Sequence, residues 1–172
     1  MKIQSDTNKT FGRRKGKKLS NLQIENLRKY IDNFSIFQKK IDGTFKLQKI
    51  NPRELFDNLD DIRLEIGFGM GDFLFEKASS YPKVGFVGCE FFQNGVSSLL
   101  SKILKYKIKN IRIHFGNCID LLQNLEFQTL NYIYMLYPDP WPKTKHKKRR
   151  LFNHTNATHL CSLLKKKGTL II

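Results

Sequence analysis

The sequence predicts an α/β fold built on a doubly wound, mostly parallel sheet. Short apolar runs typical of buried strands alternate with segments of helical periodicity from residue 62 to the end of the 172-residue chain. This alternation indicates parallel strands with helices on both faces. Three glycines at every second position, Gly67, Gly69 and Gly71, directly follow the first strand. Strand, glycine turn and helix in that order are typical of a nucleotide-type ligand site.

Two helix starts are expected before the sheet. Ser20 can cap a helix over residues 21–33, because a serine hydroxyl accepts from the free amides of the first turn. The apolar side of that helix would carry Leu22, Leu27, Tyr30 and Ile31. Asn51 can cap a second helix, since Pro52 suits the first helical position.

The sheet itself is expected to hold five strands. Their predicted ranges are 62–66, 84–89, 111–115, 130–137 and 168–172. Apolar residues at helical spacing predict the connecting helices from residue 72, over 96–104, over 119–125 and over 157–164. Because the chain ends within the apolar run of its last strand, we expect the sequence to be cut short and the domain to be incomplete.

The net charge of +16 indicates a polyanionic partner, either nucleic acid or an anionic membrane. Residues 1–18 carry seven Lys/Arg and one Asp, and residues 143–150, the basic loop, carry six Lys/Arg and no acid. Each stretch therefore contributes +6. We expect residues 1–20 to be a flexible basic arm, followed by one domain over residues 21–172.

The remaining composition predicts a cytoplasmic protein without a metal site. Cys89, Cys118 and Cys161 are widely spaced and odd in number, which disfavours a disulfide framework or a zinc site. We expect three reduced, buried thiols. None of the four histidines stands at metal-ligand spacing from another ligand type. No apolar run approaches the length of a membrane span, and the polar N-terminus lacks the apolar core of a signal peptide.

Glu90 ends the second predicted strand, 21 residues after Gly69. In doubly wound folds an acid at this position accepts hydrogen bonds from the ribose of a bound nucleoside. Asp72 stands where a dinucleotide fingerprint has its third glycine, and the Gly-Lys-Ser/Thr of a phosphate loop is absent from the turn. S-adenosylmethionine, a nucleoside without phosphates, fits better, because its ammonium suits an acid such as Glu65. The alternative is a tight structural turn with a surface glutamate.

Asn117 follows the third predicted strand, where the next ligand-facing turn should lie. Its side-chain amide could pair with the edge of an adenine. The alternative is a turn-forming asparagine after Gly116.

The most specific stretch is Pro-Asp-Pro-Trp-Pro at residues 138–142. It follows the fourth predicted strand and should lie over the carboxyl edge of the sheet, where ligands of open α/β sheets bind. Its three prolines stiffen the loop and hold Asp139 beside Trp141, an aromatic ring that could pack against a base. The basic loop follows, with Lys143, Lys145, His146, Lys147, Lys148, Arg149 and Arg150. A charge run is usually only a solvated face, but at a ligand site it indicates a track for a phosphate backbone.

These motifs closely resemble the bacterial tRNA (guanine-N(7)-)-methyltransferase family. The matching stretches are residues 11–14, 64–71, 87–90, 110–112 and, above all, 138–141 with 145–150. The resemblance implies a Rossmann-like domain of the class I S-adenosylmethionine-dependent methyltransferase type that lacks the family's last strands. It also implies methyl transfer to nitrogen 7 of a guanine in the variable loop of tRNA.

The resemblance also implies roles for individual residues. Glu65 and Glu90 would contact S-adenosylmethionine at the glycine turn. Asp139 would be the active-site acid at the cofactor, with Lys143 as a neighbouring substrate contact. Residues 145–150 would touch the RNA, and we add Arg13 and Arg14 because both basic stretches are expected to grip the tRNA together. Asn117 stands where the family has an acid, so adenosine binding is expected to be altered but kept.

Two other classes of function remain open at this stage. Asn117 and the early end of the chain favour a catalytically weakened or inactive RNA-binding protein with a methyltransferase fold. An amino-methyltransferase acting on DNA or protein would also have a proline-rich loop after its fourth strand. Trp141 and the basic loop favour RNA, so we expect tRNA as the partner and neither DNA nor a membrane. The oligomeric state is left open.

Overall fold

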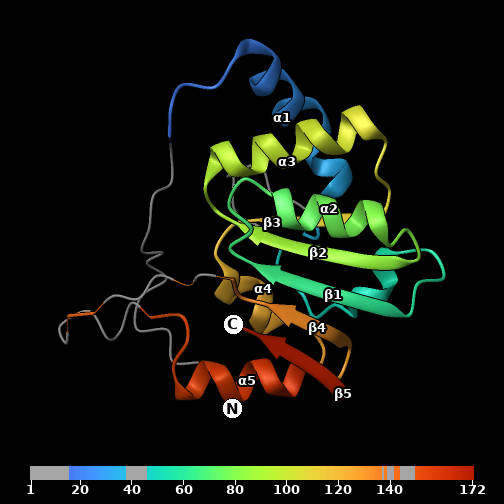
Figure 1. Cartoon of the computed structure of the whole chain (residues 1–172), viewed down its shortest axis with the longest axis vertical. Helices are drawn as coiled ribbons and strands as arrows, with labels where there is room; N and C mark the ends of the chain where they lie inside the picture. The colour runs from blue at the N-terminus through green and yellow to red at the C-terminus, as the bar shows by residue number, and fades with distance from the viewer. Residues whose placement is uncertain (1–15, 38–45, 137, 139–141, 144–149) are drawn as a thin grey trace.

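A computed structural model of the chain describes residues 16–37, 46–136, 138, 142–143 and 150–172 (Figure 1). Its sheet has five strands in the order β3-β2-β1-β4-β5. They are β1 (Asp61–Ile66), β2 (Val84–Glu90), β3 (Ile111–Phe115), β4 (Leu130–Tyr134) and β5 (Leu164–Ile171). Every neighbouring pair is parallel. The predicted doubly wound parallel sheet is therefore confirmed, and its strand order reverses beside β1, where such sheets bind ligands.

The helices cover both faces of the sheet (Figure 1). On one side lie α1 (Asn21–Phe34), α2 (Asp72–Ser80) and α3 (Gln93–Tyr106), and on the other lie α4 (Cys118–Asn124) and α5 (His154–Leu163). A short 3₁₀ turn, η1 (Pro52–Leu55), precedes β1. In Figure 1 the arrowheads of β1, β2, β4 and β5 point to the same side, so the loops at the carboxyl edge gather there.

The sheet separates two apolar cores. Leu64, Val87 and Leu122 belong to the core shared with α4 and α5. Phe86, Leu74 and Leu99 belong to the core shared with α1, α2 and α3. Because β2 places Phe86 and Val87 on opposite faces, all of its residues are buried, as expected for a central strand of a parallel sheet.

The ends of the last two strands differ from the sequence prediction. β4 ends at Tyr134 instead of residue 137, because its ladders to both neighbours end there. β5 begins at Leu164 instead of residue 168, and Leu164 pairs with Leu130 before a register shift. The sequence prediction missed this start because residues 165–167 are lysines. The strand tolerates them because β5 lies at the edge of the sheet.

Both expected helix caps are present, but the second predicted helix is shorter than expected and one residue of the predicted apolar face is exposed. The Ser20 hydroxyl accepts from the Gln23 amide at 3.2 Å, and α1 begins at the next residue. The Asn51 side chain accepts from the Arg53 amide at 3.1 Å, but only one 3₁₀ turn follows. Leu22 is 66% exposed because α1 packs through its Leu27 side, so the predicted apolar face was too wide.

The three cysteines are free thiols, but only Cys89 is fully buried. Cys118 is half-buried at the start of α4, and Cys161 is exposed on the outer side of α5. The expectation of three buried cysteines was therefore wrong for Cys161, because helical spacing alone does not show which side of α5 meets the sheet.

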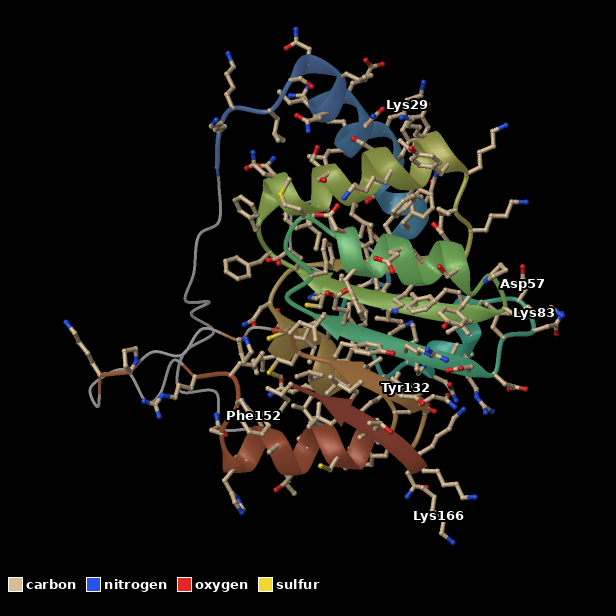
Figure 2. The ribbon with its side chains drawn as sticks, in the orientation of Figure 1. Lys29, Asp57, Lys83, Tyr132, Phe152 and Lys166 are labelled. Carbon is tan, nitrogen blue, oxygen red and sulfur yellow. The ribbon has the colours of Figure 1, made fainter. Side chains whose placement is uncertain are left out.

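Positive charge also lies outside the two basic stretches. Figure 2 shows Lys29, Lys83 and Lys166 projecting outward from α1, from the turn before β2 and from β5. Within the part of the chain that the structure describes, no helix is long and apolar enough to cross a bilayer.

Asn110 ties three segments together just before β3. Its side-chain nitrogen donates to the carbonyl oxygens of Ala78 at 3.0 Å, Tyr81 at 3.1 Å and Val84 at 2.9 Å. The residue is only 8% exposed, so water cannot readily replace this donor. The end of α2 and the start of β2 therefore depend on one amide.

The substitution Asn110→Ala should lower the free energy of unfolding by about 1–3 kcal/mol, because buried carbonyls would lose their donor. Urea denaturation followed by circular dichroism measures this loss. Asn124→Ala is a matched control, since it removes a single bond to the Asp120 carbonyl within α4. Equal losses in the two variants would contradict the bridging role of Asn110.

Candidate functional site

The glycine turn between β1 and α2 adopts a backbone that favours glycine. The φ angles of Gly67, Gly69 and Gly71 are 74°, 55° and 75°, in the left-handed region. A Cβ added at Gly67 or Gly69 would meet nothing within 4 Å, whereas one at Gly71 would lie 2.8 Å from the Leu99 Cβ. Gly71 thus allows close packing against α3, while Gly67 and Gly69 border space that a ligand can approach.

Glu90 connects this turn to α3. One carboxylate oxygen accepts from the Gly69 amide at 2.8 Å. The other accepts from the amides of Phe91 at 2.8 Å and Phe92 at 2.9 Å. The structure therefore brings the end of β2 and the glycine turn together, as the spacing of 21 residues suggested. Glu90 is only 8% exposed, so these bonds are sheltered from water.

Glu65 lies beside Glu90 and is more deeply buried. It is 3% exposed, and its Oε2 has no hydrogen-bond partner among the described residues. Burial and, to a smaller extent, the negative charge of Glu90 raise the pKa of Glu65 to about 7. A buried carboxylate with a spare lone pair beside a second carboxylate is a favourable place for a cation. No group of three His, Cys, Asp or Glu side chains in the described ranges could hold a metal ion.

Two residues of α3 hold the glycine turn from the other side. A Cβ on Gly95 would lie 1.9 Å from the Gly69 carbonyl oxygen, so the two backbones are in direct contact. The Lys102 ammonium donates to the Met70 carbonyl at 3.0 Å and to the Asp72 carboxylate. Sequence reasoning missed both residues. A glycine directly before the helix predicted over residues 96–104 was the signal for Gly95, but no local pattern indicates the contacts of Lys102.

Asn117 lies at the same edge of the sheet, where it caps α4. Its side-chain oxygen accepts from the Ile119 amide at 3.1 Å, and the preceding Gly116 amide donates to the Glu90 carbonyl at 3.1 Å. The side chain therefore has the local, turn-forming role that was one of the two alternatives. A contact between its amide and an adenine stays a prediction.

The loop after β4 leaves the sheet next to Glu65. Tyr134, the last residue of β4, pairs with Glu65 in the ladder to β1. Farther along, Lys143 is exposed, and the Arg150 guanidinium donates to the Pro142 carbonyl at 3.4 Å. The ends of the basic loop are therefore close together. The other candidates of this region and of the arm lie outside the described residues: Asp139, Trp141, Lys145, His146, Lys147, Lys148, Arg149, Arg13 and Arg14.

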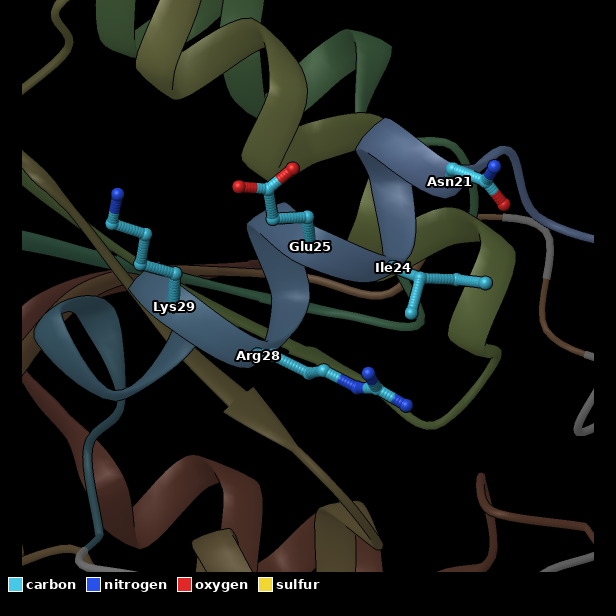
Figure 3. A pocket seen from close by; sticks show the side chains of 5 residues that line it. All are labelled: Asn21, Ile24, Glu25, Arg28 and Lys29. Atoms are coloured by element: carbon cyan, nitrogen blue, oxygen red, sulfur yellow. The ribbon is translucent and has the colours of Figure 1, made fainter.

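A separate surface hollow of about 600 Å³ lies along α1 (Figure 3). Its described lining residues are Asn21, Ile24, Glu25, Arg28 and Lys29. None belongs to the glycine turn or to the carboxyl ends of the strands. The hollow is therefore not part of the site formed by Glu65, Glu90 and the turn.

Comparison with known proteins identifies related chains. A family model described as "Putative methyltransferase" matches residues 60–172. A tRNA (guanine-N(7)-)-methyltransferase of Zymomonas mobilis is 37% identical over 92% of this chain and 65% of its own length. One of Rhizobium johnstonii is 39% identical over 92% of this chain and 66% of its own length. The chain spans 60–66% of the length of the first curated relatives it matches.

Solved structures share the fold at low sequence identity. A 30S ribosomal A1408 methyltransferase from an uncultured bacterium superimposes with a TM-score of 0.51 and 16% identity, over 74% of this chain and 61% of the other. Phosphoethanolamine N-methyltransferase 2 of Haemonchus contortus, in complex with S-adenosyl-L-methionine, gives 0.50 and 16%, over 67% and 24%. These likenesses confirm the predicted methyltransferase-type α/β fold.

Glu65 should make the fold less stable as the pH rises. Its pKa is about 7 in the folded chain against 4.5 as the ordinary value. Between these values the folded state keeps a proton that the unfolded state has lost, so the free energy of unfolding falls from pH 4.5 to pH 7 and then levels off. Glu65→Gln should remove this pH dependence. It should raise the free energy of unfolding at pH 8 by about 3 kcal/mol, because each tenfold change in proton affinity corresponds to roughly 1.4 kcal/mol.

Urea denaturation of the parent chain and the variant at pH 5 and pH 8 measures this difference. Glu126→Gln is a matched control, because Glu126 is exposed. If the parent and the Glu65→Gln variant lose equal stability between the two pH values, the ionisation of Glu65 does not destabilise the fold.

Proposed function

The chain belongs to the tRNA (guanine-N(7)-)-methyltransferase family, and we propose that it transfers a methyl group from S-adenosylmethionine to nitrogen 7 of a guanine in tRNA. The membership agrees with the resemblance seen in the sequence motifs. The target guanine would lie in the variable loop. Because tRNA is a cytoplasmic substrate in bacteria, the cytoplasm is the proposed compartment.

The observation that carries this proposal is the pair of buried carboxylates beside the glycine turn. The unpartnered oxygen of Glu65 would accept from the ammonium of S-adenosylmethionine. Glu90 would accept from its ribose hydroxyls. The open backbone at Gly67 and Gly69 would let the amino acid end approach, and the first amides of α2 suit its carboxylate. The residues present therefore fit this cofactor.

The proposed reaction needs little base catalysis from the protein. S-adenosylmethionine supplies a methyl group on a cationic sulfur, and nitrogen 7 of guanine already presents a lone pair. The chain's own residues must align that nitrogen and exclude water, and alignment of this kind can supply roughly 7–11 kcal/mol of a barrier. Asp139 would orient the purine or stabilise the positive charge that develops on its ring, and it is not assigned as a general base.

The basic residues would bind the tRNA backbone. Lys143 would contact the substrate nearest the site, because it follows the Pro-Asp-Pro-Trp-Pro stretch directly. The rest of the basic loop and the basic arm would track neighbouring phosphates. Neither DNA nor a membrane is proposed as a partner.

Methyl transfer is tested by incubating the chain with tRNA and labelled S-adenosylmethionine and then mapping the modified base. We expect label on nitrogen 7 of a variable-loop guanine. Asp139→Asn should lower turnover by about 100-fold, the size of effect known for one preorganised electrostatic group. Asp57→Asn is the matched control, because Asp57 lies at the opposite edge of the sheet from the carboxyl ends of the strands (Figure 2).

Two results would contradict the proposal in different ways. Full turnover of the Asp139→Asn variant would remove the role given to that acid. Binding of tRNA without any binding of S-adenosylmethionine would instead support an RNA-binding protein that keeps only the fold, the class favoured by Asn117 in place of an acid.

Binding to tRNA should weaken steeply with salt. If the arm and the basic loop together make six to ten phosphate contacts, affinity should fall by about 10³-fold or more between 50 and 200 mM salt. Fluorescence titration of labelled tRNA at several salt concentrations measures the slope. A flat slope would show that the two basic stretches do not bind the backbone together.

A further inference from the structure

The last residues of the basic arm are attached to the first turn of α3. The Gly16 amide donates to the Asn94 side-chain oxygen at 2.7 Å. The Asn94 side-chain nitrogen donates in turn to the Lys17 carbonyl at 2.7 Å. One amide side chain therefore satisfies a donor and an acceptor of the arm, although 78 residues separate Gly16 from Asn94. Figure 1 shows the start of α3 on the side to which the strand arrowheads point.

This attachment is next to the candidate cofactor site. Asn94 lies two residues after Phe92, whose amide binds the Glu90 carboxylate at 2.9 Å. Its neighbour Gly95 contacts the Gly69 carbonyl. The start of α3 therefore contacts Glu90 and the glycine turn through its backbone. It contacts the arm through the side chain of Asn94.

A side chain at residue 16 would be tight against the start of α3. A Cβ on Gly16 would lie 3.0 Å from the ring of Phe92 and 3.1 Å from the Asn94 side chain. An alanine there would have to displace either the ring or the amide. The arm is therefore fitted to this turn of α3, and Gly16 provides a second, independent way to perturb the contact.

The side chains that follow the contact are cationic and free to meet a polyanion. Lys17 and Lys18 are exposed, and the Asn94 bond uses the backbone of Lys17 and not its ammonium. Arg13, Arg14 and Lys15 directly precede Gly16 in the sequence. Since residues span at most about 3.5 Å each, fixing Gly16 keeps the cations of Lys17 and Lys18 within reach of the site edge.

We propose that Asn94 is a positioning residue that fastens the basic arm at the edge of the Glu90 site, so that the arm's cations contact the phosphate backbone of the RNA there. Fastening raises the local concentration of those cations beside the bound RNA, which strengthens binding without a new contact from Asn94 itself. The inference rests on the proposed function, because it takes tRNA as the polyanion.

The test compares tRNA affinity and its salt dependence in four chains: the parent, Asn94→Ala, an arm in which Arg13, Arg14, Lys17 and Lys18 are all changed to Gln, and the combination. Asn94→Ala should weaken binding about tenfold, the effect of two lost hydrogen bonds of ordinary strength. The slope of log affinity against log salt should become less steep by about 2, as phosphate contacts are lost. In the neutral arm, Asn94→Ala should have no further effect.

Matched variants separate this role from a general loss of structure. Gly16→Ala should reproduce both changes. Asn33→Ala, which removes an exposed amide from α1, should leave affinity and slope unchanged. Asn94→Ala should leave the affinity for S-adenosylmethionine, measured by calorimetry, within about twofold, because Glu90 keeps its own hydrogen bonds.

The possible failures are distinguishable. If the parent chain does not bind tRNA with a steep salt slope, the proposed function fails. If the parent binds as expected but Asn94→Ala keeps the parent affinity and slope, or weakens binding equally in the neutral arm, only the role of Asn94 is overturned.

Discussion

The arrangement of the site depends on the carboxylate of Glu90. Its two oxygens accept three backbone amides, from Gly69 in the glycine turn and from Phe91 and Phe92 before α3. Hydrogen bonds to a charged acceptor are stronger than neutral ones, and this acceptor is almost fully buried. The end of one central strand thereby sets the shape of the turn after its neighbour, and any ligand at that turn must lie against the same carboxylate.

Two buried acids in one place would be costly in a site that held no ligand. Glu65 has a carboxylate oxygen without a partner among the described residues, and its pKa is raised to about 7 mainly by burial. Buried charge that lacks compensation disfavours the folded state. Such groups are typical of functional sites, where a ligand supplies the missing partner. A cationic cofactor fits that requirement, which is why the site favours S-adenosylmethionine over an anionic dinucleotide.

The same edge of the sheet holds the described points from which the two proposed RNA-binding stretches extend. The arm reaches it through Asn94, and the segment that leads to the basic loop leaves the sheet at Tyr134, beside Glu65. These two stretches are far apart in the chain. Parallel strands bring their attachment points together, because the start of α3, which carries Asn94, follows β2 and the basic loop follows β4, and connections that follow the strands of such a sheet emerge at the same edge. A cofactor and a polyanion can therefore be bound side by side.

The sequence by itself determined the sheet, the glycine turn, the acid that ends β2 and the family, because strand alternation, glycine spacing and the Pro-Asp-Pro-Trp stretch are local patterns. It also determined the caps at Ser20 and Asn51, whose partners lie within three residues. Only the tertiary structure decided the roles of Gly95, Lys102 and Asn94. Each contacts a segment at least 26 residues away, at Gly69, Met70 and Gly16, and local periodicity carries no information about such contacts. The early start of β5 was decided in the same way, since pairing with β4 outweighs the low strand preference of its lysines.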